Sequence, residues 1–212
     1  MRVKFCGITR IEDAREAVRL GAWAIGLNHW AGSPRRCDPA TALAISSELR
    51  RKIEVCGVFV NATLDEIAAV VEDEQLSMVQ LHGEEGPVFC QEAARRTGAK
   101  VIKAIRVNTS AELQAAETFR TDYHLLDAHR HGSPGGTGTS FDWELVRGHH
   151  SEVPMILAGG LNPANVAAAI EVAAPFAVDV ASGIESAPGI KDHRLMAAFA
   201  EAAGVRVPVA HP

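Results

Sequence analysis

The chain has 212 residues, of which 47% are hydrophobic, and its formal net charge at pH 7 is −5. This length and composition predict one folded domain with a sizeable core rather than a disordered protein. The negative charge and the lack of a basic stripe exclude nucleic-acid binding as the main role, and neither a membrane span nor a signal peptide is expected.

Eight short apolar runs recur from one end of the chain to the other, and their starts are 22 to 32 residues apart. Runs of this kind are typical of strands that are buried on both faces. The predicted strands are Arg2–Cys6, Ala24–Asn28, Glu54–Val60, Met78–Leu81, Val101–Ile105, Tyr123–Asp127, Met155–Ala158 and Ala177–Val180.

Segments with helical periodicity lie between these runs. Thr63 followed by Glu66 is a capping-box pattern, which predicts a helix over Leu64–Val71. Asn162 is expected to be the N-cap of a helix over Ala164–Ala173. The alternation of strands and helices therefore continues through the whole chain.

Eight strand–helix units predict either a closed (β/α)₈ barrel or a doubly wound sheet. The even spacing favours the α/β TIM barrel of eight parallel strands with outer helices, and the G-x-G-x-x-G turn of a doubly wound nucleotide-binding fold is absent. We expect one barrel domain over residues 1–204. Residues 205–212, with two prolines and no periodicity, are expected to form a loose C-terminal tail.

Cysteines and histidines give no sign of a metal or a disulfide. The four cysteines are scattered and include no C-x-x-C pair, so we expect a reducing, cytoplasmic setting. The loop histidines His129, His131, His149 and His150 have no carboxylate or cysteine nearby at ligand spacing. No metal is therefore expected.

Two reactive side chains end predicted strands, at the end where barrels carry their active sites. Cys6 ends the first strand and Asp127 ends the sixth. Free cysteines are often core residues, and an aspartate at a strand end can cap the following turn. A thiol and a carboxyl group across one barrel mouth would instead provide an acid and a base for proton transfer.

Glycine-rich turns follow the seventh and eighth strands, where barrels often bind phosphate through backbone N–H groups. Gly159-Gly160 and Ser182-Gly183 are the candidates, and Gly138 belongs to a similar turn after the sixth strand. Simple tight turns are the alternative explanation. In the loop after the second strand, Arg35 has the planar fork that suits a carboxylate or phosphate, whereas Arg36 is expected to be a surface residue.

Four further polar residues are expected at the pocket: Lys4, Gln80, His82 and Asp179. Lys4 and Cys6 share one face of their strand because side chains alternate. A nearby ammonium would favour the Cys6 thiolate, and Asp179 is a plausible counter-ion for Lys4. A purely structural ion pair between Lys4 and Asp179 is an equally good interpretation.

Several motifs resemble those of the phosphoribosylanthranilate isomerase family, and the resemblance covers almost the whole chain. Its carriers are Lys4-Phe5-Cys6-Gly7-Ile8-Thr9, Gly32-Ser33-Pro34-Arg35, Gly57-Val58-Phe59-Val60-Asn61, Val79-Gln80-Leu81-His82-Gly83, Leu126-Asp127, Gly136-Thr137-Gly138, Phe141-Asp142-Trp143, Ala158-Gly159-Gly160-Leu161, the run from Val178 to Glu185, and Pro188-Gly189-Ile190-Lys191-Asp192.

The resemblance implies a (β/α)₈ barrel that needs no metal or organic cofactor. It implies that Cys6 is the general base, that Asp127 is the general acid, and that Arg35 holds the carboxylate of the anthranilate. It also implies that backbone groups of the last loops hold the phosphate, near Gly138, Gly159, Gly160, Ser182 and Gly183.

The activity implied is the Amadori rearrangement of N-(5′-phosphoribosyl)anthranilate to 1-(2-carboxyphenylamino)-1-deoxyribulose 5-phosphate, the third step from chorismate in tryptophan biosynthesis. The expected partner is this small molecule, with no nucleic acid and no membrane, and the chain is expected to be a monomer or a homodimer. His29, Ala31 and Ala181 depart from the family pattern, the first two at the expected anthranilate pocket and the third near the phosphate.

Two alternatives remain from the sequence. One is a sister phosphosugar-barrel isomerase of histidine or tryptophan biosynthesis. A histidine-pathway isomerase would use two aspartates as acid and base, whereas the first strand here ends in a cysteine. A catalytically silent barrel that serves as a scaffold would have lost Cys6, Asp127 or Arg35, and all three are present.

Overall fold

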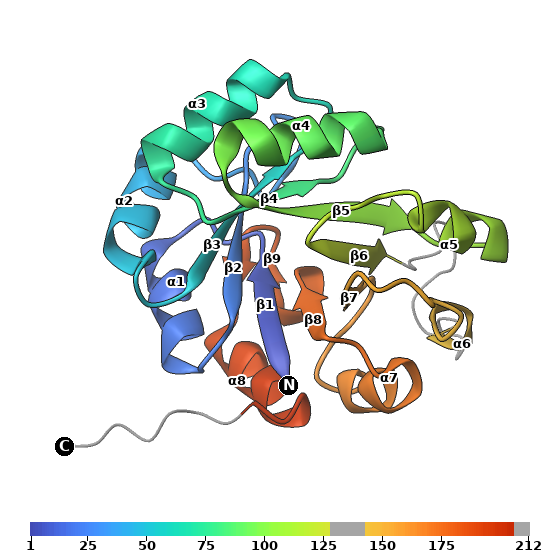
Figure 1. The fold of residues 1–212 in the computed structure, drawn as a ribbon. Coiled ribbons are helices and arrows are strands. Elements are labelled where there is room, and N and C mark those ends of the chain that lie inside the picture. The colour runs from blue at the N-terminus through green and yellow to red at the C-terminus, as the bar shows by residue number, and fades with distance from the viewer. Residues whose placement is uncertain (128–142, 206–212) are drawn as a thin grey trace.

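Eight parallel strands form a closed barrel in sequence order, so β1 pairs with both β2 and β8 (Figure 1). The computed structural model describes residues 1–127 and 143–205. The strands are β1 Arg2–Cys6, β2 Ala24–Asn28, β3 Glu54–Phe59, β4 Met78–Leu81, β5 Lys100–Arg106, β6 Tyr123–Asp127, β7 Met155–Ala158 and β8 Ala177–Val180. The predicted TIM barrel is confirmed.

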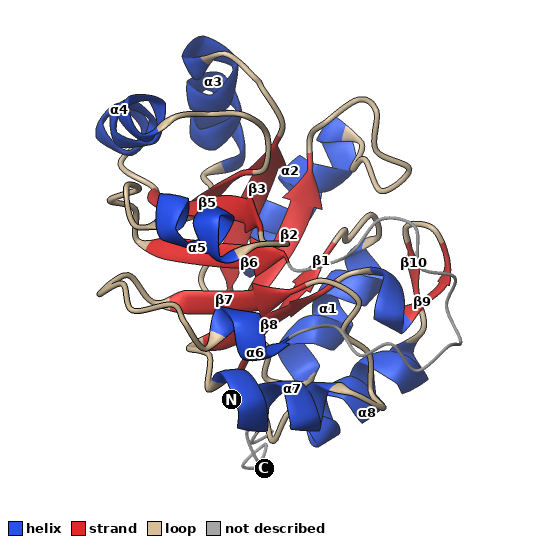
Figure 2. Cartoon of the chain, turned by 90° about the vertical axis from the view of Figure 1, so that its right-hand side faces the viewer, coloured by secondary structure: helices blue, strands red, loops and turns tan. Residues whose placement is uncertain are grey.

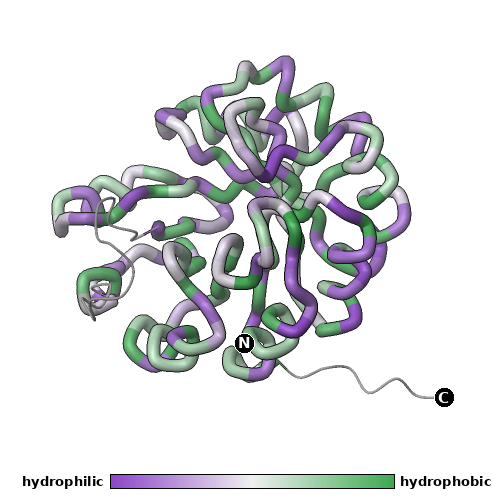
Figure 3. Tube along the Cα trace, turned by 180° about the vertical axis from the view of Figure 1, so that it is seen from behind, coloured by the Kyte–Doolittle hydropathy of each residue, from purple (hydrophilic) through white to green (hydrophobic). Residues whose placement is uncertain are grey.

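Helices surround the barrel, with the strands inside and the helices outside (Figure 2). They are α1 Ile11–Arg19, α2 Pro39–Leu49, α3 Leu64–Glu74, α4 Pro87–Thr97, α5 Ser110–Ala116, α6 Trp143–Val146, α7 Val166–Ala173 and α8 His193–Ala202. After β8 come a short 3₁₀ helix η1 (Ser182–Ile184) and a hairpin of β9 (Glu185–Ala187) and β10 (Ile190–Lys191). Hydrophilic and hydrophobic residues alternate along the outer helices, as expected for helices with one face on a sheet (Figure 3).

The predicted strand bounds agree with the structure for six of the eight strands. The other two differ by one residue, β3 at its C-terminal end and β5 at both ends. β3 stops at Phe59 instead of Val60, and Asn61 then adopts a left-handed conformation with φ 53°, which turns the chain out of the strand. β5 is longer than predicted by one residue at each end.

One helix start was predicted correctly and one was wrong. Thr63 and Glu66 form the predicted capping box at the start of α3. Asn162 is not the N-cap of α7, which begins at Val166. The Asn162 side chain instead accepts a hydrogen bond of 2.9 Å from the backbone N–H of Ala164 and closes a turn, which delays the helix.

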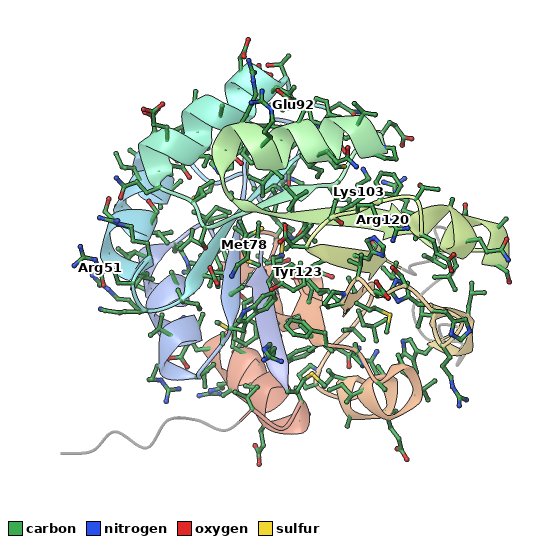
Figure 4. The ribbon with its side chains drawn as sticks, viewed as in Figure 1. Arg51, Met78, Glu92, Lys103, Arg120 and Tyr123 are labelled. Carbon is green, nitrogen blue, oxygen red and sulfur yellow. The ribbon has the colours of Figure 1, made fainter. Side chains whose placement is uncertain are left out.

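The barrel interior is filled at its N-terminal end. The rings of Trp23, Tyr123 and Phe176 pack together there, with centroids 5.3 to 5.7 Å apart, and Trp23 makes T-shaped contacts with the other two. Met78 belongs to the buried cluster against which these rings pack. Figure 4 places Met78 and Tyr123 toward the middle of the barrel, while Arg51 points outward. Because this end is packed with side chains, space for a ligand is left at the C-terminal end.

The first residue of the predicted tail, Val205, packs against the rest of the protein. Val205 lies against the core beside α8, and its backbone N–H donates to the carbonyl oxygen of Ala200. Residues 206–212 of the predicted tail lie outside the described residues. Within residues 1–127 and 143–205, none of the helices has the length and apolar character needed to cross a membrane.

Two histidines, the buried His124 and the half-buried His149, face each other between the barrel and the loop after α6. His124 Nε2 lies 2.9 Å from the carbonyl oxygen of Phe119, which can only accept, so Nε2 carries the proton. His124 Nδ1 must then accept from His149 Nε2, which lies 3.0 Å away. Burial lowers the pKa of both histidines below the usual value.

We expect the free energy of unfolding to decrease as the pH falls below about 6.5, the usual pKa of histidine. The unfolded chain takes up protons there, while the folded pair, whose pKa is lowered, stays neutral. His149→Gln keeps a donor for His124 Nδ1 but removes one titrating group, so it should lose part of this pH dependence in urea unfolding. His150→Gln, at an exposed position, is the control. Equal pH dependence in His149→Gln and wild type would contradict this account.

Candidate active site

A cavity of about 280 Å³ opens at the C-terminal ends of the strands. Nine of the residues expected at the site line it: Cys6, Arg35, Gln80, His82, Asp127, Gly159, Gly160, Asp179 and Ser182. Lys4 and Gly183 lie next to these lining residues rather than among them, and Gly138 lies outside the described residues. The cavity therefore collects side chains from strand ends that are far apart in the sequence.

Cys6 lies at the cavity wall with only 9% of its surface exposed. Burial raises the pKa of its thiol, while the ammonium groups of Lys4 and Lys191 and a hydrogen bond from Lys4 lower it, and the net shift is upward. As expected, the Lys4 ammonium lowers the pKa of the Cys6 thiol, but burial raises that pKa by more. The surroundings of Cys6 as a whole therefore favour the protonated thiol over the thiolate.

Lys4 is fully buried inside the barrel, where it contacts side chains on two other strands. Its ammonium donates to Asp179 Oδ1 at 2.7 Å and to Gln80 Oε1 at 2.9 Å. Burial opposes the charged form of Lys4, but the neighbouring Asp179 outweighs this effect and the pKa of the ammonium is raised. Lys4 is thus both part of an ion pair and the nearest cation to the Cys6 thiol.

Gly26, in the middle of β2, makes the space in which Lys4 and Cys6 meet. A Cβ atom at Gly26 would lie 2.8 Å from Cys6 Sγ and 3.2 Å from Lys4 Nζ. Sequence reasoning missed this residue, although a glycine inside a predicted strand is itself a sign of close approach by other atoms. No side chain larger than hydrogen fits here without moving the thiol or the ammonium.

Arg35 is held in place by Glu185, the first residue of the β9–β10 hairpin. Arg35 Nε lies 2.9 Å from Glu185 Oε1, and Nη2 lies 2.8 Å from Oε2. This pairing uses one edge of the guanidinium group and leaves the end that carries Nη1 for another anion. Arg36, as expected, is exposed.

A second buried cation, Lys191, holds the other side of Glu185. Its ammonium donates to Glu185 Oε1 and to the carbonyl oxygen of Ala181, both at 2.9 Å. Burial opposes ionisation of Glu185, but Arg35 and Lys191 outweigh it and lower its pKa. Sequence reasoning missed both Glu185 and Lys191, because nothing local in the chain indicates a partner 150 residues away at Arg35.

The turns after β7 and β8 pack against each other at the edge of the cavity. Gly159 and Gly160 have φ values of 96° and 64°, a region that glycine adopts without strain. A Cβ atom at Gly183 would collide with the carbonyl oxygen of Leu161, so only glycine allows the two turns to meet. Ala181, where the family pattern departs, also lines the cavity.

His29, one of the departures from the family pattern, packs outside the cavity. The His29 ring stacks on Phe59 with centroids 5.1 Å apart, and its Nε2 lies 3.3 Å from Glu74 Oε2. Neither His29 nor Ala31 is among the residues that line the cavity. Side chains alternate along β2, so Asn28 faces the cavity and His29 faces the surrounding helices.

Across residues 1–127 and 143–205, no group of three or more histidine, cysteine, aspartate or glutamate side chains is arranged to hold a metal ion. The cavity lining includes a thiol, two carboxyl groups and a histidine, together with an arginine and the glycine turns after β7 and β8. Such a set can move protons and bind an anion at each end of a small molecule.

Comparisons with known proteins agree on one family. The family model of N-(5′-phosphoribosyl)anthranilate (PRA) isomerase matches residues 3–202. An N-(5′-phosphoribosyl)anthranilate isomerase from Pseudomonas fluorescens (strain SBW25) is 45% identical over 204 residues, which are 95% of each chain.

Solved structures agree with the sequence comparison. Phosphoribosyl anthranilate isomerase from Thermotoga maritima is 41% identical, with a TM-score of 0.87 over 96% of this chain and 98% of that chain. A phosphoribosyl anthranilate isomerase in complex with reduced 1-(o-carboxyphenylamino)-1-deoxyribulose 5-phosphate is 40% identical, with a TM-score of 0.83 over the same shares.

We expect Gly26→Ala to slow alkylation of Cys6 by iodoacetamide at neutral pH, because the added methyl group separates the thiol from Lys4 and raises its pKa further. Overpacking of this kind costs about 1–3 kcal/mol of stability. The reaction reports on Cys6, which lines the cavity, whereas Cys37, Cys56 and Cys90 are almost fully buried and are not among the lining residues.

Gly57→Ala is the matched control. A Cβ there would lie 2.6 Å from Leu76 Cδ1, away from the cavity, so the variant should lose stability without a change in alkylation rate. Equal alkylation rates in Gly26→Ala and wild type would show that Gly26 does not govern the environment of the thiol.

Proposed function

The chain belongs to the N-(5′-phosphoribosyl)anthranilate isomerase family, and we propose which of its residues carry out that isomerisation. It is an isomerase of tryptophan biosynthesis. The observation that carries the proposal is that Cys6 on β1 and Asp127 on β6 line one cavity together with Arg35 and the glycine turns after β7 and β8. Cys6 is the general base and Asp127 is the general acid.

The reaction begins with the opening of the ribose ring. Asp127, as the carboxylic acid, donates its proton to the furanose ring oxygen, and the bond from that oxygen to C1′ breaks as the anthranilate nitrogen forms a Schiff base. Cys6, as the thiolate, then removes the proton from C2′. The C2′–H electron pair forms the C1′=C2′ double bond, and the π pair of the C1′=N bond moves onto the anthranilate nitrogen. The resulting enolamine tautomerises to the ketone, so the substrate changes its structure without a net gain or loss of protons.

Arg35 binds the carboxylate of the anthranilate in this proposal. Glu185 occupies one edge of its guanidinium group, so the remaining end is presented in a fixed direction. The cluster of Arg35, Glu185 and Lys191 carries one net positive charge if all three are ionised. That charge favours an anionic substrate.

The phosphate lies at the turns after β7 and β8. Left-handed glycines such as Gly159 and Gly160 turn successive backbone N–H groups toward an anion. Ser182 lines the same end of the cavity, and Gly183 lets the two turns approach each other. Support for a ligand of this length comes from the related isomerase that holds a reduced deoxyribulose 5-phosphate compound.

We also propose that the partner of the chain is this small phosphoribosyl substrate, that the chain is a monomer or a homodimer, and that it works in the cytoplasm. The four unpaired cysteines support a reducing setting.

Cys6→Ser and Asp127→Asn should each reduce kcat by about 10²–10⁴, the usual contribution of a positioned acid or base. Both variants should still bind a reduced product analogue, because neither group is assigned to the phosphate or the carboxylate. Turnover is measured by the fluorescence loss of freshly made substrate and affinity by calorimetry, with Cys37→Ser as the control. Loss of analogue affinity in Asp127→Asn would make Asp127 a binding residue.

Arg35→Met should raise KM far more than it lowers kcat, because a carboxylate that stays charged throughout is bound equally in the ground state and the transition state. Arg36→Met, at an exposed neighbouring position, should leave both constants unchanged. Equal defects in the two variants would mean that the loop acts through its general positive charge and not through one arginine.

A further inference from the structure

A continuous chain of polar contacts runs through the barrel from Asp179 to Asp127. It passes from Asp179 to Lys4, from Lys4 to Gln80 and from Gln80 Nε2 to His82 Nδ1, a contact of 2.8 Å. His82 Nε2 then lies 3.9 Å from Asp127 Oδ2. Lys4 therefore interacts with the proposed base, Cys6, and is also connected through Gln80 and His82 to the proposed acid, Asp127.

The direction of every hydrogen bond in this chain is set by Lys4. An ammonium group can only donate, so the side-chain atom of Gln80 that faces it at 2.9 Å must be the oxygen. The amide nitrogen of Gln80 then faces His82, and because it can only donate, His82 Nδ1 must accept. The remaining proton of a neutral His82 ring is therefore on Nε2, the atom that faces Asp127.

His82 is held in its neutral form by its surroundings. Burial lowers its pKa most, the facing carboxylates of Asp127 and Asp179 raise it, and the facing cations of Lys4 and Arg106 lower it again. The net shift is downward, so the ring carries a single proton at neutral pH.

We propose that Gln80 is a positioning residue that fixes His82 as the Nε2–H tautomer, so that His82 can donate to Asp127 but cannot take its proton. The inference rests on the proposed role of Asp127 as the acid. A His82 ring with a bare Nε2 would compete with the substrate oxygen for that proton. A donor at the same place instead stabilises the carboxylate that Asp127 becomes once the ring has opened, and unliganded distances of this kind shorten when substrate binds.

The direct test is the ¹⁵N NMR spectrum of the imidazole groups in the full-length enzyme at neutral pH. His82→Asn identifies the signals by their loss. The expected result is a pyrrole-type Nε2 and a pyridine-type Nδ1 for His82. A pyrrole-type Nδ1 in the wild-type enzyme would overturn the proposal, whatever the activity of any variant.

Gln80→Glu tests the cause of this state. A carboxylate at position 80 still accepts from Lys4 but must also accept from His82, which places a proton on Nδ1. As the neutral tautomer, His82 could then take the proton of Asp127, and as the cation it would keep Asp127 ionised. We expect a pyrrole-type Nδ1 and a loss of about 10- to 100-fold in kcat with little change in KM, part of the roughly 10²–10⁴ that a positioned acid contributes.

Two further variants complete the test. Gln91→Glu makes the same substitution at an exposed position of α4 and should change neither the His82 signals nor kcat. Gln80→Met removes both contacts without adding a charge and should reduce kcat less than Gln80→Glu does, and it serves if the charged variant fails to fold.

Unchanged His82 signals in Gln80→Glu would refute the role of Gln80, and moved signals with unchanged kcat would refute its effect on the reaction. An active Asp127→Asn enzyme would instead refute the assignment of the acid and leave the tautomer result intact.

Discussion

The ion pair between Lys4 and Asp179 is the constraint on which the arrangement of the site depends. The two residues are register partners on β1 and β8, the strands that close the barrel, and their charged atoms lie 2.7 Å apart. A buried pair of charges is stable only when its geometry is good and its remaining hydrogen bonds are made. Gln80 supplies such a bond to Lys4, and Gly26 provides the space for the ammonium, so residues of four strands have to fit around one group.

The sequence predicted the parts of the structure that depend on local pattern. Short apolar runs located the strands. The C-terminal ends of those strands located Cys6, Asp127, Gln80 and His82, because all parallel strands of a barrel end at the same rim. Contacts between distant segments were not predictable in this way. No local sequence pattern indicates a role for Glu185 or Lys191 at the site. Their contacts arise because the hairpin folds back onto Arg35.

The misjudged positions have equally physical reasons. Asn162 is of a residue type that often caps helices, but its side chain accepts from the backbone N–H of Ala164 and closes a turn before the helix. The sequence could not say toward which side of the barrel wall His29 would point, since one residue of difference in register reverses the direction. Lys4 lowers the pKa of the Cys6 thiol, as predicted. Burial raises that pKa by more, and the extent of burial depends on packing that no short motif encodes.

The residues that orient Arg35 belong to the hairpin after β8, whereas the proposed proton-transfer residues belong to the barrel strands. Arg35 is aimed by Glu185 and Lys191, which belong to this hairpin, and Thr9 Oγ1 donates to the carbonyl oxygen of Gly189 at its tip (Figure 2). Cys6 and Asp127 belong instead to strands of the barrel ladder. Exchange of a short surface segment during evolution can thus redirect the arginine toward a different ligand, while the proton-transfer groups keep their rigid support.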